Sequence, residues 1–196
     1  MEAPRILLAS GSPRRRLLLE EAGFHVESRV PVIDDADVRF SETIPSRIVI
    51  SLAWFKASQI DWNGNEALAM VAADTVCDLD GKVLGKPHTP DEAENMLRSM
   101  FERAHVTRTG VCVRGADSRF LFDDASVVRM GTPKEDDLHR YLESEEWRGK
   151  AGGYNLSDRI EAGWPIECDG DPTTVMGLPM LRLVPILEDI GGHHGG

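Results

Sequence analysis

Residues 8–18 read Leu-Ala-Ser-Gly-Ser-Pro-Arg-Arg-Arg-Leu-Leu, and this stretch decides how the chain begins to fold. The apolar run 5–9 is typical of a short buried strand. Ser12 is a favourable N-cap residue, and Pro13 suits the first position of a helix. The sequence therefore predicts a strand, a Ser-Gly-Ser loop and a helix with three arginines in its first turn.

Three arginines at a helix N-terminus oppose the helix dipole, whose positive end lies there. Two later helix starts, Thr89-Pro90-Asp91-Glu92 and Thr132-Pro133-Lys134-Glu135, instead read as capping boxes with an acid at the third helical position. A cationic first turn becomes reasonable where an anion binds. Free backbone N–H groups, a small loop and guanidinium groups together predict a phosphate-binding site.

The chain has 196 residues and a net charge of −11, which allows one large domain or two small ones. An acidic chain is a poor candidate for a broad duplex-binding surface. Arg14, Arg15 and Arg16 therefore form a local positive spot that suits a small anion better than a polymer. A non-specific RNA or DNA binder led by these arginines is an alternative that the net charge disfavours.

The sequence also carries expectations about the cellular environment. No apolar run approaches the ~20 residues that span a bilayer, and no signal peptide is visible before the first strand, so we expect no membrane association. Cys77, Cys112 and Cys168 are far apart and form no Cys-x-x-Cys pair. They indicate reduced thiols in a cytoplasmic protein.

Strand and helix patterns alternate early, and an antiparallel pair of strands follows in the middle of the chain. This order predicts a mixed α/β sheet with flanking helices, one domain over 1–190 and a loose tail over 191–196. The expected elements are a strand at 5–9, a helix at 13–22, an extended segment near 26–33, a helix at 46–60, a strand at 67–73 that ends at Asp74, a hairpin at 75–84 with an Asp80-Gly81 turn, a helix at 90–101, strands at 104–114 and 119–130, a helix at 133–144, a Gly-rich loop at 149–158 and a helix at 179–190.

Acidic side chains supply the candidate catalytic groups. An aspartate that ends a buried strand, as Asp74 is expected to do, can hold a hard cation or activate a water. Ligands of open α/β sheets collect at strand ends, where both Ser10 and Asp74 are expected. Asp34, Asp35 and Asp37 offer three more carboxylates, which a solvated turn would explain equally well.

Two lysines add positive charge at other points of the chain. Lys56 falls on the predicted helix 46–60, and Lys86 follows the predicted hairpin. Each alone is typical of a surface lysine, but with the arginines they would surround a polyphosphate. Magnesium would bridge such a ligand through one or two carboxylates. The sequence contains no Ser–His–carboxylate pattern typical of a hydrolytic triad.

These residues belong to motifs that resemble, in order and over nearly the whole chain, those of the Maf family. This family comprises nucleoside triphosphate pyrophosphatases, also called septum-formation inhibitors. The matching motifs are Leu8-Ala9-Ser10-Gly11-Ser12-Pro13-Arg14-Arg15, Ile33-Asp34-Asp35, Leu52-Ala53 with Lys56-Ala57, Ala73-Asp74-Thr75-Val76, Asp80-Gly81, Leu84-Gly85-Lys86-Pro87, Thr109-Gly110-Val111, Lys150-Ala151-Gly152-Gly153-Tyr154 and Val175-Met176-Gly177-Leu178-Pro179.

The resemblance implies a two-lobed mixed α/β fold around a deep cleft, related to inosine triphosphate pyrophosphatases. It implies hydrolysis of a nucleoside triphosphate to the monophosphate and diphosphate with a divalent cation, Mg²⁺ or Mn²⁺. Homodimers are a family expectation. The implied roles are proton acceptor and metal ligand for Asp74, metal ligand for Asp35, substrate selection for Arg14 and Thr75, and phosphate binding for Ser10, Arg15, Lys56 and Lys86.

Three positions depart from the family pattern. Ser157 stands where the dTTP/UTP branch commonly has glutamine, and Asp35 and Ser51 replace a glutamate and an arginine. Arg14 and Thr75 match the dTTP/UTP branch rather than the branch acting on 7-methyl-GTP. We therefore expect a nucleotide-pool house-cleaning enzyme acting on dTTP/UTP or modified nucleotides. The alternative is a nucleotide-sensing protein with little turnover that is linked to control of cell division.

Overall fold

The computed structural model describes residues 3–32 and 44–193. The strands are β1 (Arg5–Leu8), β2 (His25–Ser28), β3 (Ala69–Leu79), β4 (Lys82–Leu84), β5 (Arg103–Arg114), β6 (Arg119–Met130) and β7 (Ile166–Asp169). The helices are α1 (Pro13–Glu21), α2 (Pro45–Ser58), α3 (Pro90–Met100), α4 (Glu135–Glu143), the 3₁₀ turn η2 (Ala151–Gly153), α5 (Leu156–Glu161), α6 (Pro172–Met176) and α7 (Met180–His193).

The strands form one mixed sheet in the order β2-β1-β3-β5-β6-β7, and β4 pairs with β3 beside this path. β1 is parallel to both of its neighbours, and the other pairings are antiparallel. The mixed α/β class with flanking helices is therefore confirmed. None of the helices in the described part of the chain combines the length and the apolar character that a membrane span needs.

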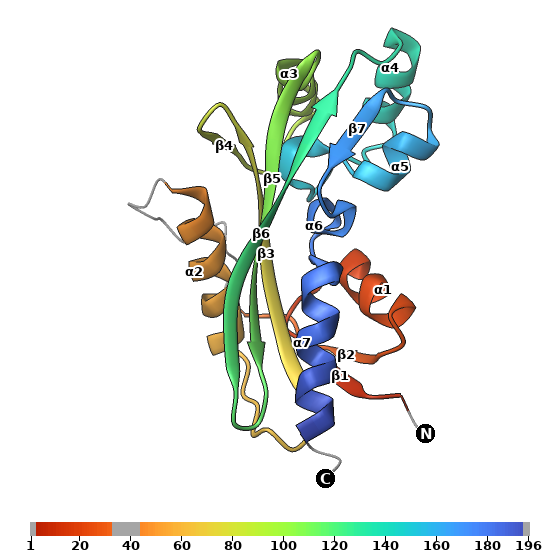
Figure 1. The fold of residues 1–196 in the computed structure, drawn as a ribbon. Coiled ribbons are helices and arrows are strands. Elements are labelled where there is room, and N and C mark those ends of the chain that lie inside the picture. The colour runs from red at the N-terminus through yellow and green to blue at the C-terminus, as the bar shows by residue number, and fades with distance from the viewer. Residues whose placement is uncertain (1–2, 33–43, 194–196) are drawn as a thin grey trace.

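The long strands β3, β5 and β6 run through the whole molecule and connect its two ends (Figure 1). One end carries α1, α2, α7, β1 and β2, and the other carries α3, α4, α5, β4 and β7. Each end has its own buried apolar cluster. The first includes Ile6, Val71 and Leu183, and the second includes Leu97, Leu138 and Trp147. A third cluster packs α2 on the sheet through Ala53 and Ala72.

Between the two ends, one edge of β3 lacks a neighbouring strand. β1 pairs with β3 up to Val71, and β4 pairs with it only from Cys77 onward. Over residues 72–76 the ladder continues on the β5 side alone. The sheet therefore opens at the middle of β3, where side chains from both faces can reach the same space.

Several local predictions are confirmed. Ser12 caps α1 by accepting a hydrogen bond from the backbone N–H of Arg15, and Pro13 is the first helical residue. Arg16 forms an exposed ion pair with Glu20, one turn further along the helix. Asp80 and Gly81 both have positive φ, 52° and 82°, as a type I′ turn requires.

The prediction that the strand ends at Asp74 is wrong, because β3 continues through this residue to Leu79. Asp74 lies mid-strand, opposite Gly110 of β5. The partner strand β5 extends the ladder well beyond the point where β1 stops. Asp74 reaches the cavity through the open edge of β3, so a carboxylate in the middle of this strand can still contact a ligand.

The capping box predicted at Thr132 is also wrong. The backbone N–H and the hydroxyl of Thr132 both donate to Glu102 Oε1, at 2.8 and 2.9 Å, and helix α4 begins only at Glu135. The box at Thr89 forms in part. The Thr89 hydroxyl accepts from the N–H of Glu92, while the Glu92 carboxylate accepts from the N–H of His88.

The sequence patterns missed three short elements. Helix α5 begins inside the predicted Gly-rich loop, and β7 and α6 lie in the stretch 159–178, for which no element was predicted. The last helix starts one residue later than expected and continues past Ile190 to His193, into the stretch expected to be a loose tail.

Candidate active site

A cavity of about 770 Å³ lies at the open edge of β3. It gathers residues from α1, α2, β3, β5 and α6 and from the loops that follow β1, β2, β4 and α4. Most of the residues predicted from sequence line it together, namely Ser10, Arg14, Arg15, Lys56, Asp74, Thr75 and Lys86. Among the described residues that line it, Asp74 is the acidic one and the arginines and lysines predominate. The cavity therefore suits a strongly anionic ligand.

Asp74 and Lys56 form a buried ion pair at the centre of this cavity. Lys56 Nζ donates to Asp74 Oδ1 at 2.5 Å, and the two side chains are only 12% and 7% exposed. Lys56 comes from the last turn of α2, which packs on the sheet face toward which Asp74 points. A buried carboxylate paired in this way is held in one orientation and is shielded from bulk water.

Gly110 allows α2 to come close enough for this contact. It pairs directly with Asp74 across the ladder, and a Cβ atom at this position would lie 2.4 Å from the backbone of Val49 in α2. Lys56 follows Val49 by two helical turns and so lies on the same side of the helix. The missing side chain at Gly110 therefore sets the distance between helix and strand at which Lys56 reaches Asp74.

Arg15 is held by three different parts of the chain. Its Nε donates to the carbonyl of Gly177 at 2.9 Å, while Nη1 donates to Ser10 Oγ at 3.3 Å and Nη2 donates to Thr75 Oγ1 at 3.1 Å. These partners are neutral oxygens. These three contacts fix the guanidinium group at the wall of the cavity.

Two threonine hydroxyl groups, on the neighbouring strands β3 and β5, connect Arg15 to helix α6. Thr75 Oγ1 lies 2.8 Å from Thr109 Oγ1 on β5, and the Thr109 hydroxyl donates to the carbonyl of Thr174 in α6 at 2.7 Å. Thr109 is fully buried. Thr109 starts the Thr109-Gly110-Val111 motif but was not predicted from the sequence as a site residue. Thr109 connects the cleft to α6 and fixes the Thr75 hydroxyl that Arg15 uses.

Arg14 points to the opposite wall of the cavity. Its Nη1 donates to Ser157 Oγ at 2.9 Å, and its Nη2 lies 3.3 Å from Asp158 Oδ2. Ser157 does not line the cavity itself but meets it through Arg14. Burial raises the pKa of Asp158, but hydrogen bonds from Asn155 and Ser157 and the charges of Arg14 and Lys150 outweigh burial and lower this pKa below its ordinary value.

The loop after β4 and the Gly-rich segment join in one wall of the cavity. The N–H of Gly152 donates to the carbonyl of Gly85 at 3.0 Å, next to Lys86. Lys86 and Lys150 both line the cavity from this wall. Burial lowers the pKa of Lys150, and Asp158 and Glu146 oppose that shift. Lys150 and Arg148 are basic lining residues that were not predicted from the sequence as site residues.

Tyr154 and His105 lie beneath this wall. The Tyr154 hydroxyl is 2.7 Å from His105 Nε2, and the two rings meet edge to face at 5.6 Å. Both side chains are buried, and His105 Nδ1 has no hydrogen-bond partner in the described residues. Burial lowers the pKa of His105 to about 4, so the ring is neutral at physiological pH.

The residues present fit a single divalent cation held jointly with a ligand. Mg²⁺ commonly binds through one or two carboxylates and the phosphates of a substrate. Asp74 supplies one carboxylate beside the arginines and lysines that line the same cavity. The second predicted ligand, Asp35, lies outside the described residues, and those residues contain no group of three or more acidic, histidine or cysteine ligands.

Comparison with known proteins gives a consistent result. The family model described as Maf-like protein matches residues 5–190. A dTTP/UTP pyrophosphatase of Rhodopirellula baltica is 38% identical over 188 residues, which cover 94% of this chain and 81% of the relative. A dTTP/UTP pyrophosphatase of Bacillus cereus is 35% identical over 184 residues, which cover 94% of each chain. A dTTP/UTP pyrophosphatase of Bacillus anthracis shows the same identity and coverage.

Proposed function

The chain belongs to the Maf family, and we propose that it hydrolyses nucleoside triphosphates to the monophosphate and diphosphate. One observation carries this proposal. A buried carboxylate, Asp74, shares its cavity with fixed Arg15 and with Lys56 and Lys86, a charge arrangement suited to a triphosphate. The relatives named dTTP/UTP pyrophosphatase support the same reaction.

In the proposed reaction, a water molecule attacks the α-phosphorus and the Asp74 carboxylate accepts its proton. The bond between the α-phosphorus and the bridging oxygen breaks, and diphosphate leaves. Lys56 orients the carboxylate through the 2.5 Å contact. Arg15, Lys56 and Lys86 offset the negative charge that grows on the phosphate oxygens. Because the partners of Arg15 already fix it, this stabilisation needs little rearrangement during the reaction.

We include a divalent cation, Mg²⁺ or Mn²⁺, in this proposal. Asp74 would hold it together with phosphate oxygens of the substrate, and Asp35 is the second proposed ligand. When bound, the cation would offset charge on the leaving diphosphate. Asp74 lies beside the cations that would bind the same phosphates, which supports this assignment.

For the substrate we propose dTTP and UTP, the nucleotides in the names of the relatives. Arg14 and Thr75 carry the residue types of that branch. Ser157 is the shorter replacement for the branch's glutamine, and its hydroxyl accepts from Arg14 Nη1. In this chain the two positions therefore act as one unit at the cavity wall, with Arg14 supplying the longer side chain.

The test is release of diphosphate from a panel of normal and modified nucleoside triphosphates, with and without Mg²⁺. We expect dTTP and UTP to be hydrolysed fastest. Asp74→Asn should lower kcat by about 10²–10³ or more, because it removes the proton acceptor while keeping the side-chain shape. The fold is checked by circular dichroism. Glu167→Gln, which changes an exposed acid on β7, is the matched control and should retain full activity.

Two results would contradict the proposal. Near-normal diphosphate release by Asp74→Asn would remove Asp74 from the reaction. Tight nucleotide binding by the unaltered protein without diphosphate release would favour the alternative, a nucleotide-sensing protein.

A further inference from the structure

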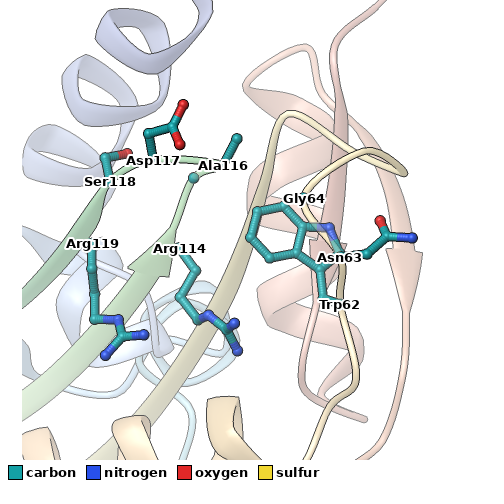
Figure 2. Close-up of a pocket in the computed structure, with 9 residues that line it drawn as sticks. Trp62, Asn63, Gly64, Arg114, Ala116, Asp117, Ser118 and Arg119 are labelled. Carbon is teal, nitrogen blue, oxygen red and sulfur yellow. The ribbon is translucent and has the colours of Figure 1, made fainter.

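A second cavity, of about 510 Å³, lies at the closed end of the β5–β6 hairpin. Its walls are the segment 62–64, which follows α2, and the hairpin residues 114–119. Figure 2 shows these two segments facing each other across the cavity. None of its lining residues lines the cavity at Asp74, so the two sites are separate in the structure.

Two arginines meet in this cavity from neighbouring strands. Arg114 of β5 and Arg119 of β6 are direct cross-strand partners. Their side chains extend in the same direction, whereas Asp117 points away from them on the other side of the turn (Figure 2). Like charges placed directly opposite each other destabilise a pair of strands. The hairpin therefore brings together two positive charges at an energetic cost.

Neither guanidinium group has a carboxylate partner in the part of the chain that the structure describes. Arg114 lies over the ring of Trp62, with its Cζ 5.7 Å from the ring centroid. Other arginines of this acidic chain commonly pair with a carboxylate, as Arg108 does with Asp123 and Arg159 with Glu146. Arg114 and Arg119 therefore place positive charge beside this cavity.

The walls of the cavity add further polar groups. The Ser118 hydroxyl and the Asn63 amide are among its lining side chains. Trp62 is only 7% exposed, and its ring lies beside Arg114, so a ligand bound at Arg114 would change the surroundings of the indole.

We propose that this cavity binds the phosphate group of a small molecule between Arg114 and Arg119. Two guanidinium groups match the geometry and charge of phosphate oxygens, and such an anion would remove the repulsion between them. The phosphate group can come from a free anion, such as inorganic diphosphate, or from the phosphate end of a nucleotide. The binding site is independent of the reaction proposed for the cleft and requires no turnover there.

The indole N–H of Trp62 gives a direct readout in a ¹H–¹⁵N correlation spectrum, where Trp62→Phe assigns its signal. Sodium diphosphate and, separately, uridine monophosphate are titrated into the full-length protein at constant ionic strength. We expect a saturable shift of this signal. The double variant R114Q/R119Q should weaken binding at this site by about tenfold or more, because charge-assisted hydrogen bonds to both arginines are lost.

Two controls separate this site from the cleft. Arg129→Gln changes an exposed arginine of the same strand β6 and should leave the titration unchanged. Arg15→Gln should weaken anion binding in the cleft, but the Trp62 signal should still shift when diphosphate or uridine monophosphate is added. Diphosphate release by R114Q/R119Q should equal that of the unaltered protein, so failure of the proposed reaction and failure of this proposal are distinguishable.

Each outcome decides the proposal. Saturation by both ligands assigns the shared phosphate group, and saturation by diphosphate alone assigns the free anion. Saturation by uridine monophosphate alone assigns the nucleotide. The proposal would be overturned if neither ligand gave a saturable shift, or if R114Q/R119Q responded in the same way as the unaltered protein.

Discussion

Two arginines of the cleft, Arg14 and Arg15, can be compared with the two arginines of the hairpin cavity, Arg114 and Arg119, and the two pairs are held differently. In the cleft, Arg15 donates to Ser10, Thr75 and the Gly177 carbonyl, and Arg14 donates to Ser157. In the hairpin cavity, Arg114 lies over the ring of Trp62, and the Arg119 side chain has no hydrogen-bond or ion-pair partner in the described residues. The two sites therefore differ in how many contacts hold each arginine side chain, not in the number of positive charges in the pair.

This difference indicates what each site can do. A cation held by several oxygens is already placed when charge develops in a reaction, so it can stabilise a transition state. A cation held by one aromatic ring can adjust to a ligand but has to lose side-chain freedom on binding. We therefore expect chemistry in the cleft and simple binding at the hairpin, and the following predictions test that contrast.

The largest effect is expected from matched substitutions of one arginine in each site. Arg15→Gln should lower kcat/KM for diphosphate release by about 10²–10³, because a fixed charge beside the phosphates is lost. Arg114→Gln should change it by less than about twofold. Steady-state kinetics with the best nucleotide measures both. Similar losses in the two variants would end the contrast between the sites.

The second effect is a pH dependence of the free energy of unfolding that arises from His105, which contacts the cleft residue Tyr154. The pKa of His105 is lowered from 6.5 to about 4 in the folded protein by burial. The unfolded chain therefore binds more protons between these values, and the free energy of unfolding should fall as pH falls from about 6.5 to 4. The total contribution is about 3 kcal/mol. Arginines stay charged over this range, so the hairpin pair adds no such dependence.

Urea unfolding between pH 4 and 7.5 measures this effect. His105→Gln should remove most of the acid sensitivity, and His25→Gln, which changes an exposed histidine of β2, should retain it. An unchanged pH profile in His105→Gln would assign the sensitivity to other groups.

A smaller effect is expected from the hydroxyl chain behind Arg15. Thr109→Val keeps the shape of the side chain but removes the hydroxyl between Thr75 and the Thr174 carbonyl. Because Thr75 then loses its fixed partner, Arg15 should be less well placed, and kcat should fall by about tenfold with a smaller change in KM. Thr109→Ser should restore most of kcat. Equal kcat in the Val and Ser variants would limit Thr109 to a packing role.

The smallest effect concerns the stability of the hairpin. Arg119→Gln removes the like charge opposite Arg114 and should raise the free energy of unfolding by about 0.2–1 kcal/mol at low ionic strength. Added salt should reduce the difference between variant and parent, because it screens the repulsion. Thermal unfolding at two salt concentrations measures both. A less stable variant at low salt would show that Arg119 already has a stabilising contact.

Local signals allowed much of the fold to be predicted, and distant contacts account for most of the errors. Ser12, Pro13 and the Asp80-Gly81 turn act within a few residues of themselves, so the helix start and the turn followed from the sequence. Thr132 carries an equally clear local signal, but Glu102, 30 residues earlier, takes its hydrogen bonds. The position of Asp74 within β3 depends on where β1 and β4 pair, which no local pattern encodes.

The same distinction applies to the candidate site. The Ser-Gly-Ser-Pro-Arg-Arg motif identified Ser10, Arg14 and Arg15 as phosphate-binding candidates from local chemistry. The contact between Arg14 and Ser157 joins residues 143 positions apart and appears only in the folded chain. Thr109 was missed because a threonine in a strand is ordinary, and its role depends on α6 packing against the sheet. The signal in the sequence was a threonine followed by a glycine, Gly110, inside a predicted strand, where glycine is unusual.

The continuity of β3, β5 and β6 through both ends of the molecule has a mechanical consequence. Each of these strands has 11 or 12 residues and connects the apolar cluster of one end to that of the other (Figure 1). A change in the angle between the ends cannot be confined to one hinge peptide and has to be spread as extra twist along three hydrogen-bonded strands. A force that opens or closes the cleft should therefore change its width gradually, because the deformation is distributed along the full length of these strands.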